Sequence, residues 1–236
     1  MINLVLLPGI VCDRAAWEQV LSALPSTARC HIPDYGAADT IFAMAQDVLA
    51  DAPATFSLAA HSMGTRVALE IVRIAPQRVE RLALLAGAYK PLPVGALGQL
   101  EAEKRYHLLD VAKREGMRAM AREWVRGMVH PERITDAVLI EEIEAMIERK
   151  TPAILAAQIR ALLDRPDARS VLAALPVPLW LIAARQDAWS PLSQQEEMAV
   201  LARSAQLRII ENCGHMSPME QPEQVASALR EWLASD

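Results

Sequence analysis

Short apolar runs alternate with amphipathic segments through both ends of the chain. The runs are continuous rather than alternating, which is typical of strands buried on both faces of a parallel sheet. They cover residues 2–7, 28–32, 55–60, 81–86, 179–184 and 206–210. Between them, hydrophobic residues recur at helical spacing, so we expect helices after Asp13, from Thr40 to about Asp51, and between Ser62 and Pro76. This alternation predicts an α/β fold with a mostly parallel sheet of about six strands.

The pattern changes between residues 90 and 175, where no convincing strand is found. Helical periodicity dominates this stretch instead, and Thr151-Pro152 has the residue types of a helix N-cap and first turn. The predicted helices cover residues 97–115, 117–129, 135–149 and 151–163. We therefore expect an all-helical cap over residues 90–175, inserted into a core formed by residues 1–89 and 176–236.

The segment Ala60-His61-Ser62-Met63-Gly64 joins the third predicted strand to the helix that follows it. A serine between small residues at such a joint is typical of a nucleophile elbow, in which a strained turn exposes the hydroxyl. A serine can also cap a helix at this position without any chemistry, and the five residues alone do not separate the two interpretations.

Two further residues in the loops after predicted strands favour catalysis. Asp187 follows the fifth strand and His215 follows the sixth, and parallel sheets place their sites at the carboxyl ends of the strands. The order serine, acid, histidine is that of a hydrolase triad on such a sheet. In this interpretation Ser62 is the nucleophile, His215 the general base and acid, and Asp187 the residue that orients the imidazole.

The backbone N–H groups of Ile10 and Met63 are the candidates for an oxyanion hole. Ile10 follows Pro8-Gly9 at the end of the first strand, and Met63 follows the serine. Both positions are expected to face the carbonyl oxygen of a substrate, where such donors stabilise developing negative charge.

The remaining histidines are weaker candidates for the base. We expect His61 to be a packing residue, and His31 ends an early strand and has no acid partner in the sequence. His107 and His130 lie in the helical insert and are expected on its surface. Asp34, the other loop acid of note, is interpreted as part of a turn.

The amino-acid composition of the chain argues against several classes of function. The chain is 53% hydrophobic with a net charge of −5 and no sustained basic cluster, which argues against nucleic acid as a partner. No apolar run is long enough for a membrane helix, and the first residues lack the basic stretch of a signal peptide. Three scattered cysteines fit a reducing cytoplasm and show no metal-ligand spacing. We expect a cytoplasmic protein with no metal and no cofactor that acts on a small molecule, and no feature predicts its oligomeric state.

Four motifs in this order resemble the α/β-hydrolase fold superfamily over nearly the whole chain. They are Leu6-Leu7-Pro8-Gly9 for the oxyanion loop, Ala60–Gly64 for the elbow, Asp187–Pro191 for the acid loop and Gly214–Pro222 for the histidine loop. The resemblance implies that the first two strands usual in the family are absent and that residues 90–175 are the cap. Ala60 departs from the usual glycine of the elbow. The nearest in appearance are small cap-bearing esterases, carbon–carbon bond hydrolases and carrier-protein methyl esterases of biotin synthesis.

The expected function is hydrolysis of a small carboxylic ester or thioester through an acyl-enzyme. Hydrolysis of a carbon–carbon bond in a vinylogous diketone, or of a lactone, would use the same triad, and the sequence does not separate these reactions. A ligand-binding protein without activity is the alternative from another class. From position alone, Tyr89, Trp124, Met128 and Trp189 are candidates for the substrate pocket.

Overall fold

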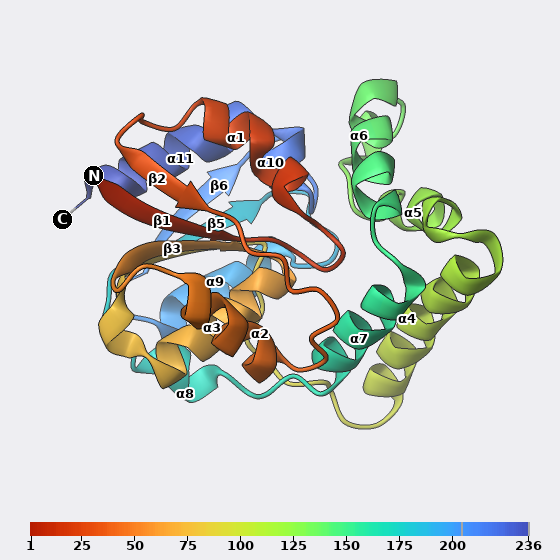
Figure 1. Cartoon of the computed structure of the whole chain (residues 1–236), viewed down its shortest axis with the longest axis horizontal. Coiled ribbons are helices and arrows are strands. Elements are labelled where there is room, and N and C mark those ends of the chain that lie inside the picture. Colours follow the sequence, from red (N-terminus) through yellow and green to blue (C-terminus); the bar gives the residue numbers. More distant parts are fainter. Residues whose placement is uncertain (204, 236) are drawn as a thin grey trace.

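Six parallel strands form one sheet in the computed structural model, which describes residues 1–203 and 205–235. The strand order is β2-β1-β3-β4-β5-β6 (Figure 1). The strands are β1 (Ile2–Leu7), β2 (Ala28–His31), β3 (Phe56–His61), β4 (Val79–Leu85), β5 (Leu179–Ala184) and β6 (Gln206–Ile210). Ser204 and Asp236, which belong to the predicted core segment 176–236, lie outside the described residues. The predicted α/β class and the six-stranded sheet are confirmed.

The burial of each strand follows its place in the sheet. Every residue of β3 and β5 is buried, as the continuous apolar runs predict for central strands. The edge strands β2 and β6 are more exposed and carry Arg29 and Arg208. Charged residues on an edge strand hinder pairing with other chains.

Helices cover both faces of the sheet (Figure 1). One face carries α2 (Ile41–Asp51), α3 (Met63–Ile74), α8 (Arg169–Ala173) and α9 (Leu192–Leu201). The other face carries α1 (Glu18–Ser22), α10 (Ser217–Glu220) and α11 (Pro222–Ala234). Short 3-10 turns cover Arg14–Trp17, Pro76–Arg78 and Pro131–Arg133. Among residues 1–203 and 205–235, no helix is both long and apolar enough to span a bilayer.

Four helices between β4 and β5 form a separate group beside the carboxyl edge of the sheet (Figure 1). They are α4 (Ala96–Glu115), α5 (Met117–Val125), α6 (Ala137–Glu148) and α7 (Pro152–Leu163). These helices pack on one another, whereas α8 packs on α3 and α9 of the core. We propose that α4 to α7 constitute the cap and that its boundary lies after Leu163, earlier than residue 175.

Side-chain caps fix the starts of several helices. The hydroxyl of Thr40 accepts a hydrogen bond from the N–H of Ala43, and that of Thr151 accepts one from Ile154. Each cap satisfies a donor that the first turn of a helix leaves unpaired. The Thr151 cap is the one that the sequence predicts for the helix beginning at Pro152.

Ion pairs join the proposed cap to the loops that follow β1 and β2. Arg149 pairs with Asp13 at 2.9 Å, Lys150 with Asp34 at 2.7 Å, and Arg160 with Asp39 at 2.5 Å between nitrogen and oxygen. Asp34 also accepts the N–H of Gly36, as expected of a turn residue. These contacts hold α6 and α7 above the edge where the candidate residues lie.

Candidate active site

Ser62 is the single residue between the end of β3 and the start of α3, and its backbone conformation is strained. Its φ and ψ are 53° and −118°, a region that costs a residue other than glycine about 1–3 kcal/mol. The N–H of Ser62 donates to the carbonyl of Leu85, and its own carbonyl accepts from the N–H and the hydroxyl of Thr65. The turn therefore holds the hydroxyl at the start of a helix, in the geometry expected of an elbow.

Gly64 lies where α3 passes closest to the end of β1. A Cβ atom at this position would lie 2.7 Å from the carbonyl oxygens of Leu7 and Pro8. Both contacts are with backbone, which cannot rotate away. The equivalent position before the serine tolerates Ala60, which is fully buried.

Replacing Gly64 with alanine is therefore expected to destabilise the protein by about 1–3 kcal/mol, the usual cost of overpacking. The clash would also displace Pro8 and the loop that carries Ile10, so kcat should fall. Gly127→Ala is the matched control, because a Cβ there would meet nothing closer than 3.4 Å. Denaturant unfolding of both variants tests the prediction, and equal stabilities would contradict it.

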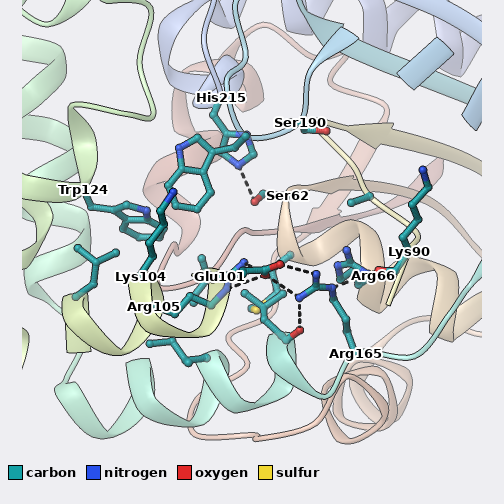
Figure 2. Close-up of a pocket in the computed structure, with 18 of the residues that line it drawn as sticks. Ser62, Arg66, Lys90, Glu101, Lys104, Arg105, Trp124, Arg165, Ser190 and His215 are labelled. Carbon is teal, nitrogen blue, oxygen red and sulfur yellow. Dashed lines mark hydrogen bonds and ion pairs between the residues drawn. The ribbon is translucent and has the colours of Figure 1, made fainter. Parts of the chain in front are cut away.

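Ser62, His215 and Asp187 form a chain of hydrogen bonds. The Nε2 atom of His215 lies 2.8 Å from the Oγ atom of Ser62 (Figure 2), and its Nδ1 atom lies 2.8 Å from the Oδ2 atom of Asp187. An ionised aspartate only accepts, so Nδ1 carries the proton and Nε2 is free to accept from the Ser62 hydroxyl. This tautomer is the one that a general base requires.

Two backbone N–H groups bind the carboxylate oxygen of Asp187 that does not face His215. The N–H groups of Trp189 and Ser190 donate to Oδ1 at 2.8 and 2.9 Å. Burial alone would raise the pKa of Asp187, but His215 and these N–H groups outweigh it and hold the pKa below its ordinary value. The carboxylate is therefore ionised and correctly turned toward His215.

The loop after β1 is held by a residue of α7. Val11 has a φ of 51°, an unusual conformation for a β-branched residue. Its N–H donates at 2.7 Å to the Oε1 atom of the buried Gln158, whose amide donates to the carbonyl of Gly36. Gln158 thus fixes the backbone next to Ile10 from the cap side. Sequence analysis missed this residue, because a contact between positions 11 and 158 leaves no local pattern.

Ile10 and Met63 both line the cavity beside Ser62. Within the described part of the chain, their N–H groups have no hydrogen-bond partner. Met63 is the first residue of α3, where N–H groups have no acceptor within the helix. The two positions are therefore available to an oxygen of a ligand.

The segment that follows α5 is pressed against the loop carrying His215. A Cβ at Gly214 would lie 2.5 Å from the backbone nitrogen of His130, so only glycine fits there. The N–H of His215 donates to the carbonyl of Met128 at 2.6 Å. The buried carboxylate of Glu220 accepts from the N–H groups of His130, Gly214 and Met216. The loop is thus fixed by both the proposed cap and the core.

A cavity of about 610 Å³ opens beside Ser62, between the core and the helices α4, α5 and α7. Trp124 and Trp189 line it, with ring centroids 5.9 Å apart, and Trp189 also lies 6.1 Å from the His215 ring. Tyr89 and Met128 do not line the cavity, contrary to prediction. Tyr89 is buried and donates to Glu197, and Met128 contacts the His215 loop through its backbone.

The other histidines do not compete for the role of base. His61 is buried and its Nε2–H donates to the backbone carbonyl of His215. Burial and the nearby His215 lower the pKa of His61 to about 3, so this ring is neutral at physiological pH. His107 is exposed and pairs with Glu123, as expected for the surface of the insert. His130 is buried instead, because its segment packs beneath the His215 loop.

The sequence is similar to a known protein family and to two curated proteins. A model described as the alpha/beta hydrolase family matches residues 4–228. Two curated relatives are pimeloyl-(acyl-carrier protein) methyl ester esterases. The one from Photobacterium profundum is 26% identical over 98% of this chain and 94% of its own length. The one from Nitrosomonas europaea is 26% identical over 95% and 93%, respectively.

Solved structures resemble the whole chain as well. A thermophilic esterase from Thermogutta terrifontis, solved with malate bound, has a TM-score of 0.89 at 28% identity, covering 99% of this chain and 89% of that one. An enol-lactonase from Burkholderia xenovorans has a TM-score of 0.84 at 20% identity, covering 99% and 92%. The latter likeness concerns the fold alone.

Proposed function

This chain belongs to the alpha/beta hydrolase family, and on that premise we propose that it is a serine hydrolase of small carboxylic esters or thioesters. The observation that carries the proposal is the unbroken hydrogen-bonded chain from Ser62 through His215 to Asp187, with Ser62 and His215 exposed to the cavity. The names of the curated relatives, both methyl ester esterases, support the same reaction class.

The first half of the reaction forms an acyl-enzyme. The Ser62 Oγ atom attacks the ester carbonyl carbon while its proton passes to Nε2 of His215, and Asp187 stabilises the resulting imidazolium. The carbonyl oxygen becomes an oxyanion, which the N–H groups of Ile10 and Met63 would bind. The amino end of α3 adds a favourable dipole at the same place. Collapse of the intermediate breaks the carbon–oxygen or carbon–sulfur bond as His215 returns the proton to the leaving alcohol or thiol.

The second half regenerates the enzyme. A water molecule, deprotonated by His215, attacks the acyl carbon, and the intermediate expels Ser62 as His215 returns the proton. The carboxylic acid product then leaves. Trp124 of α5 and Trp189 of the loop after β5 line the cavity, with Trp189 next to the His215 ring, and the proposed cap sets the shape of the acyl site.

Hydrolysis of p-nitrophenyl acetate, butyrate and octanoate tests this function. We expect all three to be cleaved, with kcat/KM rising from acetate to butyrate because each buried methylene adds about 0.8 kcal/mol, or about fourfold. The cavity is large enough for such chains. Absence of turnover, together with absence of labelling by a fluorophosphonate, would contradict the proposal and favour a ligand-binding protein without activity.

A further inference from the structure

Basic side chains gather at one end of the cavity beside Ser62. Arg66 of α3, Arg105 of α4 and Arg165 lie together there, while the carboxylate of Glu101 lies among them (Figure 2). Glu101 accepts hydrogen bonds from Arg105 at 2.8 and 3.0 Å and from Arg165 at 2.7 and 2.8 Å. One carboxylate among three guanidinium groups leaves an excess of two positive charges.

Arg66 is the member of this group without an acidic partner. Its Nη1 atom donates to the backbone carbonyl of Lys90 at 2.9 Å, a carbonyl that Arg165 also contacts. Within residues 1–203 and 205–235, no other hydrogen bond and no ion pair of Arg66 is present, although a guanidinium has five N–H donors. The other four donors therefore have no protein partner among these residues, and Arg66 lines the cavity.

The surroundings of Arg66 disfavour its charge. Burial, followed by the nearby Arg165, lowers its pKa to about 9, and Glu101 offsets this only in part. The residue also lies in the first turn of α3, where the helix dipole opposes a positive charge. Such an arrangement is costly in the empty protein and becomes favourable when an anion binds.

The cavity walls indicate what the anion is attached to. The proposed cap contributes aliphatic residues to these walls, from α4 Leu97, Leu100 and Leu108 and from α7 Leu155, Ile159 and Leu162. Arg66 follows Ser62 by one helical turn, a rise of about 6 Å along α3. Both side chains line the same cavity, so an aliphatic chain bound in it would lie between the hydroxyl of Ser62 and the guanidinium of Arg66.

We propose that Arg66 binds a carboxylate at the end of the substrate chain, with Arg165 adding positive charge beside it, so that the preferred substrates are half-esters of short dicarboxylic acids. Two guanidinium groups already bind the carboxylate of Glu101 in this cluster, and a planar fork suits a second carboxylate in the same way. This inference rests on the proposed ester hydrolysis and names its substrate class.

The test compares charged and neutral esters of one acid. Monomethyl adipate is anionic at neutral pH and dimethyl adipate is not. We expect wild type to favour the monoester in kcat/KM, and Arg66→Gln to lower the ratio of the two kcat/KM values by about 10- to 100-fold, the worth of a charge-assisted hydrogen bond. Arg66→Lys should keep part of the preference. Lys113→Gln, an exposed site on α4 outside the cavity, removes the same charge and should leave the ratio unchanged.

Two results would overturn the inference. The first is a wild type with no preference for the monoester. The second is an Arg66→Gln variant in which both kcat/KM values fall equally, the result expected if Arg66 only holds the backbone carbonyl of Lys90. If the variant does not fold, a second measurement on wild type replaces it. This measurement is the inhibition of p-nitrophenyl butyrate hydrolysis by adipate. Stronger inhibition by adipate than by butyl phosphate or by adipamide, its uncharged diamide, supports a carboxylate site, and stronger inhibition by either of these two contradicts it.

Binding separates this inference from the proposed function. Calorimetric titration of Ser62→Ala with monomethyl and dimethyl adipate needs no turnover. Tighter binding of the monoester without any hydrolysis by wild type would support the anion site while contradicting the hydrolase. Hydrolysis of neutral esters with equal binding of both ligands would support the hydrolase and contradict the anion site.

Discussion

Ser62→Ala is expected to lower kcat for p-nitrophenyl butyrate by about 10⁴- to 10⁶-fold, the usual effect of removing a serine nucleophile. The methyl group has no atom that can attack the carbonyl, and His215 keeps its bond to Asp187. The oxyanion donors and the cavity remain, so a small residual rate above that in water is expected. Steady-state kinetics with purified protein measure the effect.

Controls distinguish loss of the nucleophile from loss of the fold. Ser170→Ala changes an exposed serine of α8 and should keep wild-type kinetics. Ser62→Ala should retain the wild-type circular dichroism spectrum, because neighbouring backbone bonds hold the elbow. A folded Ser62→Ala variant that turns over at more than a tenth of the wild-type rate would rule out Ser62 as the nucleophile.

Asp187→Asn is expected to lower kcat by about 10⁴-fold through the wrong imidazole tautomer. The N–H groups of Trp189 and Ser190 require an acceptor at Oδ1, so the amide would place its NH₂ group toward His215. Nδ1 of His215 would then have to accept, and Nε2 would carry the proton facing Ser62. A ring protonated at Nε2 cannot take the serine proton, so kcat falls while KM changes little.

The pH dependence follows from the lowered pKa of Asp187. Its pKa in the folded protein lies below the ordinary value of 3.8, so the stabilisation from its ionised form is complete above that value and is lost as pH falls through the folded-state pKa. The carboxyl group of Asp187 should therefore stay ionised from about pH 8 to about pH 5, which the ¹³C chemical shift of this carboxyl in labelled protein would show. A chemical shift that reached the value of a protonated carboxyl within this range would contradict the account.

Much of the fold could be predicted because its signals are local. Six apolar runs mark the strands, and the helix caps at Thr40 and Thr151 lie next to the segments that they start. The short helices α8 and α10 were missed, since segments of five and four residues show no periodicity. The order of Ser62, Asp187 and His215 was readable because each follows a strand of the same sheet.

What could not be predicted depends on contacts distant in sequence. Gln158 holds the loop at Val11, and the carbonyl of Met128 holds His215, through packing of the proposed cap on the core. The same packing decides that Trp124 and Trp189 reach the cavity whereas Tyr89 does not. Arg66 lies within an ordinary helical pattern, and its missing partner is visible only once α4 and Arg165 are placed around it.

The central claim is that Ser62 is a nucleophile activated by His215, and covalent labelling tests it most directly. Wild type and His215→Ala would be treated with a fluorophosphonate and analysed by intact mass and peptide mapping. The account predicts one adduct on wild type, located at Ser62, and labelling slowed by orders of magnitude in His215→Ala. Wild type that remains unlabelled, or that carries its adduct at another residue, would contradict it.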